Sequence, residues 1–388
     1  MAAAALLSRD GHRITIFERF EAPRPLGSGL MLQPTGLAVL HQLGLAEKAI
    51  AAGERIERLH GEARGRVVLD VQYSALRARM AFGVGIHRAA LFSLINEELV
   101  ASGVTTATGH EVAGVERDAG GISLRFQNGC REGPFDLVID ALGTRSVLSP
   151  DRGRDLRYGA LWTNLSLPDG FDPHALTQRY RRASIMAGVL PIGRLSWSGP
   201  PLAAFFWSLR DSDYPDWRER GLDRWKEEVC DLWPEARKLV DQIESAETLT
   251  FARYAHKTLR QPVEERLIHI GDSWHSASPQ LGQGANMALL DAYALTTALR
   301  ERSEIADALC RTAQFRRSHV QLYQWLTAVL TPVYQSDSRL IPLLRDWLMG
   351  PASKLWPFTA FQAALVSGLV GSPLRRLGIG FAPAQTGR

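Results

Sequence analysis

Residues whose types and spacing suit a ligand-binding site follow one another closely after a short β-rich run at residues 266–270. In chain order they are Gly271, Asp272, His275, Pro279, Gly282 and Gly284. A helical pattern then extends from about Ala285 to Arg300. Glycines let the backbone approach a ligand closely, and the first turn of a helix presents unpaired N–H groups at the positive end of its dipole. An acid, a glycine turn and a helix start in this order predict a site for a large, polar, partly anionic cofactor.

The same stretch resembles the second flavin motif of FAD-dependent aromatic hydroxylases of the para-hydroxybenzoate hydroxylase type, which are group A flavin monooxygenases. The resemblance rests on Gly271-Asp272…His275…Pro279…Gly282-Gln283-Gly284-Ala285-Asn286…Asp291-Ala292. It implies that Asp272 accepts hydrogen bonds from the ribityl hydroxyls of FAD. It also implies that the turn at residues 282–286 places backbone N–H groups beside the N1–C2=O edge of the flavin, where reduction puts negative charge. The cofactor-binding residues predicted from this turn are Gly282, Gln283, Gly284, Ala285 and Asn286.

His275 and Pro279 are the predicted catalytic candidates of this stretch. Histidine titrates near neutral pH, so His275 could move a proton, although the family more commonly uses this position structurally. Pro279 lacks a backbone donor and stiffens the loop beside the flavin ring. In the family, a flavin C4a-hydroperoxide formed from O2 hydroxylates an electron-rich ring, so the cofactor carries the chemistry. Accordingly, the sequence holds no Ser-His-Asp set in a nucleophile-elbow context.

The start of the chain predicts a second contact with FAD. Residues 2–11 form a helical pattern closed by a glycine, and residues 13–17 are typical of a β-strand. Glu18 and Arg19 follow this strand, where an acid in a dinucleotide-binding unit hydrogen-bonds the adenosine ribose. No first strand and no G-x-G-x-x-G turn precede them in this sequence. A truncated reading frame and a true variant without the turn both explain this. We favour truncation, because a missing central strand would leave its neighbours unpaired.

Three further positions match cofactor contacts of the resembled family. Gln33 ends a loop rich in glycine and proline at residues 23–35, which in the family lies between the adenine end and the flavin. Arg88 opens an Arg-x-x-Leu helix, and its guanidinium suits the ribityl and phosphate region of FAD because it binds phosphate in a bidentate manner. Gly143 lies at the family's Asp-Gly motif, which serves FAD and the pyridine nucleotide. Leu142 replaces the aspartate of that motif, which puts normal NAD(P)H handling in question.

Residues 157–251 have a different sequence pattern, with several strand-like runs, which predicts a substrate-binding sheet. Strands are expected at 158–167, 178–190 and 202–209, followed by one amphipathic helix at 216–232. Many of the tryptophans fall here, and aromatic side chains suit either a flat apolar ligand or an ordinary core. The predicted substrate contacts are Tyr180, Arg182 and Trp207, for a phenolic or carboxylate-bearing ligand. Residues 303–345 are expected to be helical, with breaks at Pro332 and Pro342.

Composition excludes several classes of protein. The 388 residues are 45% hydrophobic and 22% charged, as in an ordinary globular protein of two or so domains. The net charge is only +4 and the arginines are dispersed, so no nucleic-acid partner is expected. Three distant cysteines indicate neither disulfides nor a metal site, which favours a reduced, cytoplasmic compartment. The most apolar stretch, 355–370, is too short to span a membrane. We expect a monomer or homodimer.

The predicted fold is α/β, with a Rossmann-like FAD-binding domain that lacks its first strand, an interwoven and mostly antiparallel β-sheet substrate domain, and C-terminal helices. We assign residues 1–64, 85–155 and 252–317 to a discontinuous FAD-binding domain. Residues 65–84 and 156–251 form the substrate sheet, and 318–388 the C-terminal helical segment.

These features predict an FAD-dependent monooxygenase that uses NAD(P)H and O2 to hydroxylate or epoxidise a flat aromatic, polycyclic or quinone-like substrate. A truncated or degenerate flavoprotein without catalysis is the alternative to which the missing turn and Leu142 point. A flavin-dependent halogenase or an isoprenoid or quinone-ring hydroxylase would share the fold. The Trp-x-Trp-x-Ile-Pro segment expected of such a halogenase is absent from the sequence.

Overall fold

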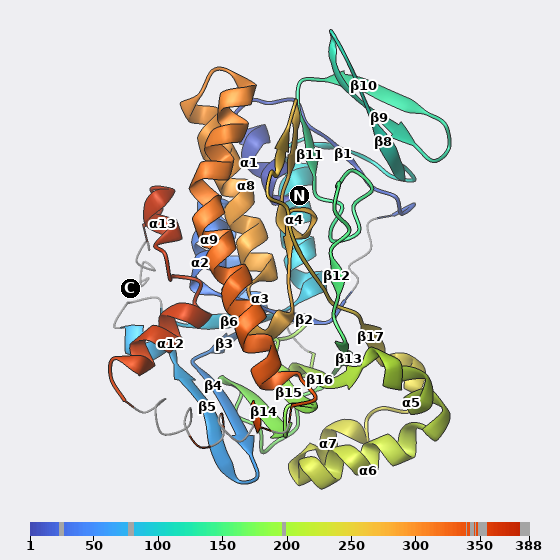
Figure 1. Ribbon diagram of the computed structural model, residues 1–388, viewed down its shortest axis with the longest axis vertical. Helices are drawn as coiled ribbons and strands as arrows, with labels where there is room; N and C mark the ends of the chain where they lie inside the picture. The colour runs from blue at the N-terminus through green and yellow to red at the C-terminus, as the bar shows by residue number, and fades with distance from the viewer. Residues whose placement is uncertain are drawn as a thin grey trace.

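The computed structural model describes residues 1–22, 27–76, 81–195, 199–338, 340–341, 345, 347 and 355–380. Figure 1 shows long helices packed side by side along one edge, a large sheet at the lower end, and a small hairpin sheet projecting at the upper end. The first residues of the 23–35 loop and the predicted break at Pro342 lie outside the described residues. Within the described part of the chain, no helix is long and apolar enough to cross a membrane.

One half of the molecule combines short parallel strands with helices. Strand β1 (Thr15–Phe17) pairs in parallel with β7 (Thr105–Ala107), and β11 (Val138–Asp140) pairs in parallel with β20 (Leu267–His269), which β19 (Val263–Glu264) extends. Among the described residues, no strand joins the β1–β7 pair to the β11–β20–β19 sheet. The gap expected between these neighbours is therefore present.

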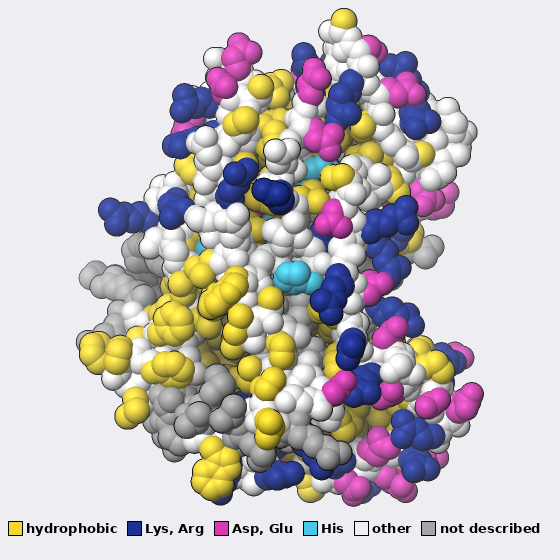
Figure 2. Space-filling model, viewed as in Figure 1, with side chains coloured by type: hydrophobic (Ala, Val, Ile, Leu, Met, Phe, Trp, Pro, Cys, Tyr) yellow, Lys and Arg dark blue, Asp and Glu magenta, His cyan; other side chains and the backbone are white. Residues whose placement is uncertain are grey.

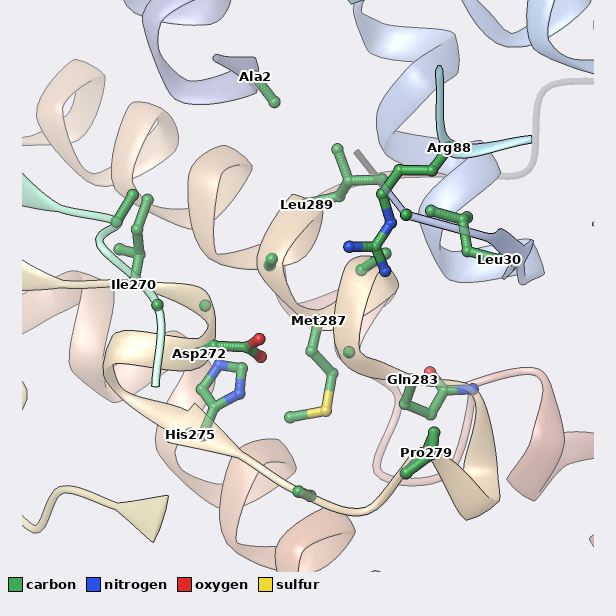
Figure 3. A pocket seen from close by; sticks show the side chains of 18 of the residues that line it. Ala2, Leu30, Arg88, Ile270, Asp272, His275, Pro279, Gln283, Met287 and Leu289 are labelled. Atoms are coloured by element: carbon green, nitrogen blue, oxygen red, sulfur yellow. The ribbon is translucent and has the colours of Figure 1, made fainter. Parts of the chain in front are cut away.

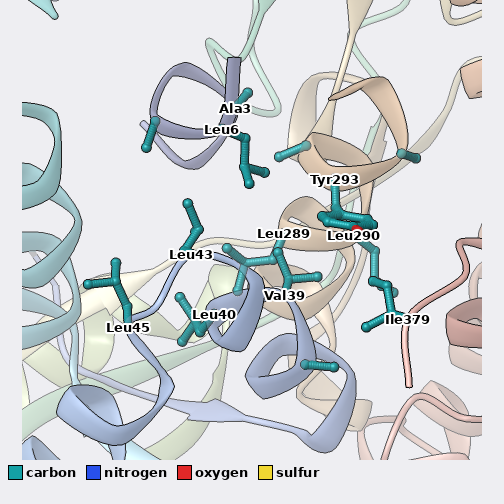
Figure 4. Packing of buried hydrophobic residues seen from close by; sticks show 14 of the residues in the cluster. Ala3, Leu6, Val39, Leu40, Leu43, Leu45, Leu289, Leu290, Tyr293 and Ile379 are labelled. Carbon is teal, nitrogen blue, oxygen red and sulfur yellow. The ribbon is translucent and has the colours of Figure 1, made fainter. Parts of the chain in front are cut away.

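Helices pack tightly beside these strands. Helix α1 (Ala2–Arg9) and helix α2 (Pro34–Gln42) both lie against α8 (Gly284–Glu301). Figure 4 shows Leu6 of α1, Val39 of α2 and Leu289 of α8 in the space between these helices, and each is at most 6% exposed. The alanines of α1 allow this close approach because they carry no long side chains. This apolar core fixes the start of α8 relative to the strand ends, and that placement positions the site described below.

A seven-stranded sheet makes up most of the other half, in the order β17-β13-β16-β15-β14-β4-β5. Its neighbours are antiparallel except β14 and β4, which run in parallel. The strands are β4 (Arg58–Ala63), β5 (Arg66–Gln72), β13 (Tyr158–Ser166), β14 (Ala175–Arg181), β15 (Ile185–Pro191), β16 (Leu202–Arg210) and β17 (Thr250–Ala252). The pairing of β4 with β14 favours placing the proposed domain boundary before residue 58 instead of after residue 64.

Helices cover both faces of this sheet. Helices α5 (Tyr214–Arg220), α6 (Leu222–Leu232) and α7 (Arg237–Val240) lie on one face, where Trp207 packs edge-on against Trp225. On the other side are α9 (Ile305–Tyr334) and α12 (Phe358–Val366), whose side chains belong to the same apolar clusters as residues of the sheet. The short α13 (Pro373–Arg376) packs on α9.

The remaining elements connect these layers. They are α3 (Ala46–Ala52), α4 (Arg88–Ala101), β2 (Gly29–Leu32), β3 (Glu54–Ile56), β6 (Gly83–His87), β8 (Val112–Asp118), β9 (Gly121–Phe126), β10 (Arg131–Phe135), β12 (Arg154–Asp155), β18 (Ala255–Thr258) and β21 (His275–Ser276). Short 3₁₀ turns are η1 (Tyr73–Leu76), η2 (Asp211–Asp213), η3 (Pro234–Ala236), η4 (Ala246–Thr248), η5 (Gly271–Ser273) and η6 (Pro279–Leu281).

Three expectations about local structure were wrong. The strand expected at 178–190 is a hairpin, with Arg182 in the turn at φ 59°. The helix expected at 216–232 divides at Gly221, whose φ of 84° is outside the helical range. The break expected at Pro332 does not occur, because this residue lies inside α9 less than one turn from its end. At Gly221 the local preference of glycine for a positive φ divides the helix, and near the end of α9 the helix tolerates Pro332.

Candidate functional site

A single large cavity of about 2600 Å³ runs between the two halves of the molecule. One part is lined by α1, β1, β11, the start of α4 and the stretch from η5 to the start of α8. The other part is lined by the seven-stranded sheet, α9 and α12. Figure 3 shows the centre of the first part, where Arg88, Asp272, His275 and Pro279 surround open space.

Asp272 lies just after β20, in the turn η5. Gly271 begins this turn with φ 58°, a left-handed conformation that favours glycine. Although Asp272 lies deep in the molecule, its side chain is open to the cavity. Burial raises the pKa of its carboxyl group, while nearby His275 and Arg88 oppose that rise. The carboxylate is therefore an acceptor aimed at whatever occupies the cavity.

The glycine turn after Pro279 is shaped as the sequence predicts. Gly282 ends η6 in the left-handed region with φ 60°, and α8 starts at Gly284. A Cβ added to Gly284 would lie 4.0 Å from Asp272 Oδ1, so the helix start and the acid are neighbours. The N–H groups of the first helical turn have no acceptor within their own helix. Gly282, Gln283, Gly284 and Ala285 all line the cavity.

Asn286 is not among the cavity-lining residues, although it was predicted to contact the cofactor. Its side chain is fully buried: Oδ1 accepts from the backbone N–H of Gln33, and Nδ2 donates to the carbonyls of Met31 and Gly282. A Cβ on Gly36 would lie 2.2 Å from Oδ1, so this clamp depends on a glycine in α2. Asn286 therefore holds the β2–α2 junction against the glycine turn.

Gln33 lines the cavity, as predicted, and is held by a residue that the sequence did not single out. The hydroxyl of Tyr73 donates to Gln33 Oε1, and the phenol is fully buried. Burial raises the pKa of Tyr73, so it stays a neutral donor. Nothing in the local pattern of the sequence links these two positions, because Gln33 follows β2 whereas Tyr73 follows β5.

A buried polar network lies behind His275. His275 Nε2 is 2.6 Å from Asp291 Oδ2, which also accepts from the N–H of Gly271, and Arg316 Nε donates to the other oxygen at 2.7 Å. Despite its burial, the pKa of Asp291 falls to about 2 because His275 and Arg316 favour the charged form. Arg316 also contacts His319, whose pKa burial lowers to about 3. Asp291 therefore fixes the orientation of His275, which itself lines the cavity.

Arg88 extends into the cavity from the first residue of α4. The preceding His87 accepts a hydrogen bond from the N–H of Ala89 and thereby caps the helix. Gly27 faces the guanidinium stem, and a Cβ there would lie 2.9 Å from Arg88 Cδ. With φ 109°, Gly27 provides both the space and the turn that this arrangement requires. Arg88 forms no ion pair with another described residue, and its guanidinium faces the cavity.

The opposite end of the cavity is lined by Glu18 and Arg19, after β1, and by residues of β11. Glu18 accepts from the N–H of Phe20, and Arg19 lies over the ring of Phe20. Residues of β1 and of β11 both line the cavity, so it continues between these two strands. Both predicted residues are thus gathered into the same cavity as Asp272.

Asp140 organises the turn that contains Leu142 and Gly143. Its buried carboxylate accepts from the Leu142 N–H and from the Ser146 hydroxyl, and lies 2.7 Å from His269 Nδ1. Gly143 lines the cavity with φ 84°, and a Cβ there would meet no atom within 4 Å. Leu142 is 44% exposed at the same edge. Asp140 is therefore satisfied within the protein and does not substitute for a carboxylate at position 142.

Of the three predicted substrate contacts, only Tyr180 lines the cavity. Arg182 is exposed at the tip of the β14–β15 hairpin and does not line it. Trp207 is 2% exposed but faces α6, because alternate residues of a strand face opposite sides of the sheet. Its neighbour Phe206 lines the cavity instead. The sequence identified a strand that lines the cavity but could not determine which of its faces does so.

Trp162 and Tyr254 were not predicted and form part of this wall. Trp162 Nε1 donates to the Tyr254 hydroxyl at 2.8 Å, and Trp162 packs on Phe206 with ring centroids 4.9 Å apart. Burial raises the pKa of Tyr254 to about 12, although the bond from Trp162 opposes that rise. The tyrosine is therefore neutral near pH 7. The sequence does show many tryptophans at residues 157–251. That pattern alone did not distinguish Trp162, which lines the cavity, from the tryptophans of the core.

Comparisons with known proteins place this fold and site in a family. Residues 1–321 match the family described as "FAD binding domain". The 6-methylpretetramide 4-monooxygenase of Streptomyces rimosus is 28% identical over 332 residues, covering 82% of this chain and 77% of that protein. The 3-amino-4-hydroxybenzoate 2-monooxygenase of Streptomyces cremeus is also 28% identical, over 78% of this chain and 76% of that protein.

A solved structure of Klebsiella pneumoniae HpxO complexed with FAD and uric acid has the same fold. The TM-score is 0.79 at 17% identity, over 95% of this chain and 94% of that chain. The predicted α/β fold is therefore confirmed. The chain belongs to the FAD binding domain family and is an FAD-dependent oxidoreductase of the group A flavin monooxygenase type.

Proposed function

We propose that this protein uses NAD(P)H and O2 to hydroxylate or epoxidise a flat aromatic, polycyclic or quinone-like substrate with bound FAD. The observation that carries this proposal is the continuity of the cavity. It passes without interruption from Glu18 and Arg88 past Asp272 and the start of α8 to the aromatic wall around Trp162. A dinucleotide and a ring compound can therefore lie end to end in it.

The residues around the glycine turn fit the flavin and ribityl part of FAD. Asp272 offers a carboxylate open to the cavity, and the first turn of α8, where a Cβ added to Gly284 would lie 4.0 Å from Asp272 Oδ1, offers unpaired N–H groups. Arg88 offers a guanidinium that forms no ion pair with another described residue and can therefore bind a phosphate oxygen. Glu18 and Arg19 would hold the adenosine end. Gly143 and Gln33 would border the cofactor, and Pro279 would shape the ring's edge.

When bound, FAD would accept a hydride from NAD(P)H and activate O2, so that one oxygen atom goes to the substrate and the other leaves as water. The protein's own part is to bind, orient and exclude water. Helix α8 directs its positive end towards the place where negative charge develops. His275 is held in one orientation by Asp291, so we assign it a positioning role in the wall of the site. Tyr180 would contact the substrate.

The test is to purify the protein and measure the visible absorbance of oxidised flavin before and after reconstitution with FAD. We expect flavin to be retained, and we expect oxygen consumption with NADH or NADPH to rise when an electron-rich ring compound is added. A protein that stays colourless after reconstitution would contradict the proposal. Retained flavin without any ring-dependent oxygen consumption or product would support a non-catalytic flavoprotein instead.

A further inference from the structure

The substrate part of the cavity differs from the cofactor part in charge. All the described Asp, Glu, Lys, Arg and His residues that line the cavity lie between residues 12 and 145, or are Asp272 and His275. The described residues of the seven-stranded sheet, α9 and α12 contribute none. A ligand that reaches this wall therefore meets no opposite charge among the described residues.

Amide side chains take the place of charges on this wall. Gln178 comes from β14, Gln324 from α9, Gln335 from the end of α9 and Gln362 from α12, and each is at most 8% exposed. Gln324 Nε2 donates to the carbonyl of Ser276, which leaves its Oε1 without a partner among the described residues. Gln335 Nε2 and Gln362 Oε1 also lack partners there. These three atoms are themselves closed off from the cavity in this conformation, so a ligand would meet them only after the amide rotates. An unpaired buried amide is costly, and a polar group on a ligand would then relieve that cost.

The guanidinium of Arg345 lies behind this wall, where it acts on Tyr180 and Tyr334 but does not itself line the cavity. Arg345 is 1% exposed, is 4.9 Å from the ring centre of Tyr180 and donates to the carbonyl of Arg182. It is not among the residues that line the cavity, whereas Tyr180 and Tyr334 are. Burial raises the pKa of both phenols, so they face the cavity as neutral groups.

An apolar surface adjoins this part of the cavity. Phe361 of α12 lines the cavity and is also 48% exposed. On α9, Trp325 and Val329, which are one turn apart, are exposed as well. Figure 2 shows hydrophobic side chains gathered over the lower part of α9 and over α12. Contact with this surface would not compensate a charged ligand for its lost hydration. An apolar ligand, in contrast, would gain free energy when it leaves water.

We propose that the substrate is an uncharged ring compound, whose carbonyl, hydroxyl or amide groups are recognised by Gln324, Gln335 and Gln362, and that a carboxylate on the ring is rejected. This inference rests on the proposed function for the position of the substrate, and it deepens that function by naming a substrate class. It replaces our expectation that Arg182 would hold a carboxylate-bearing ligand. Rejection follows because a buried carboxylate loses its hydration and finds no charged side chain to pair with among the described residues that line this wall.

The test compares 2-naphthamide with 2-naphthoate, which have the same ring and similar shape but differ in charge. Their dissociation constants for the FAD-reconstituted protein are measured by equilibrium dialysis at neutral pH, and flavin content is recorded in the same samples. We expect the amide to bind roughly a hundredfold more tightly. Equal binding, or tighter binding of the carboxylate, by a protein that holds flavin would overturn this inference and leave the proposed function standing. Loss of flavin alone would count against the proposed function.

Matched variants on one helix test the role of the amides. Gln324→Leu should weaken 2-naphthamide by about tenfold, whereas Gln321→Leu, at an exposed position one turn earlier on α9, should leave it unchanged. Gln335→Leu gives an independent reading if the first variant folds poorly. If both variants at cavity positions bind the amide as the unchanged protein does, these side chains do not recognise the ligand and the proposal fails.

Discussion

The cofactor and substrate parts of one cavity are lined in opposite ways. Around Asp272, ionisable side chains face the open space and are held by buried partners such as Asp291. Around Trp162, the lining is aromatic, aliphatic and amide, with no ionisable side chain from the described sheet, α9 or α12. The cofactor part suits a ligand that carries charges and hydroxyls, and the substrate part suits a ligand that is uncharged and mainly apolar. This difference explains why family motifs identify the first part but not the second.

The largest expected effect concerns the network that supports the cofactor part. Asp291→Ala leaves the buried Arg316 without its carboxylate, which should lower the free energy of unfolding by about 3–5 kcal/mol. Urea denaturation measures this change. Glu301→Gln, which removes a partly exposed ion pair with Arg311 near the end of the same helix, should cost less than about 1 kcal/mol. Similar costs for both variants would contradict a special role for the buried network.

Removal of the cavity-facing acid should affect FAD more than stability. Asp272→Ala should weaken FAD binding by roughly 10- to 150-fold, because hydrogen bonds to a charged group contribute about 1.5–3 kcal/mol. Arg88→Met should have a comparable effect, measured by flavin fluorescence during titration of the apoprotein. Arg182→Met, on the exposed hairpin, is the control and should leave the affinity unchanged. An unchanged affinity in Asp272→Ala would separate this acid from the cofactor.

The buried histidine of the network predicts how stability depends on pH. Burial, and then the neighbouring Arg316, lower the pKa of His319 to about 3, so the folded protein keeps it neutral while the unfolded chain binds a proton below about pH 6.5. Stability should therefore fall as pH decreases from about 6.5 towards 3, with a slope approaching ~1.4 kcal/mol per pH unit from this group. His319→Gln should flatten this dependence in urea titrations at several pH values. An unchanged slope would show that His319 is protonated in the folded protein.

Neighbouring residues of β16 separate the two faces of the substrate sheet. Trp207→Leu should lower the free energy of unfolding by about 2 kcal/mol, less than the ~3–5 expected for full truncation, and should not change ligand affinity. Phe206→Leu should instead change the affinity for 2-naphthamide, because Phe206 lines the cavity. Thermal unfolding and equilibrium dialysis on the same two proteins give the comparison. A loss of affinity in Trp207→Leu larger than that in Phe206→Leu would reverse our assignment of the faces.

The smallest effect is expected at the edge of the cofactor part. Leu142→Asp restores the carboxylate of the resembled motif at a position that is 44% exposed. One additional exposed hydrogen bond contributes about 0.5–1 kcal/mol, so NAD(P)H oxidation should rise roughly two- to fivefold. Stopped-flow measurement of flavin reduction by NADH and NADPH tests this. An unaltered rate would show that Leu142 does not limit nucleotide handling.

The sequence by itself determined the cofactor part to a large extent. The order of strand, Asp272, Gly282 and helix is local, and each step depends on backbone preferences that act over a few residues. For that reason the end of the strand, the glycine turn and the start of α8 lie where the pattern predicts them.

Only the tertiary structure decided which side chains face the ligand. Asn286 belongs to the motif but clamps backbone groups, and Arg182 and Trp207 belong to the substrate strands but face away from the cavity. The alternation of a strand and the turn of a hairpin depend on pairing between residues far apart in the chain, which a single sequence does not display. The amides of α9 and α12 reach the cavity for the same reason, since packing of distant elements brings them there.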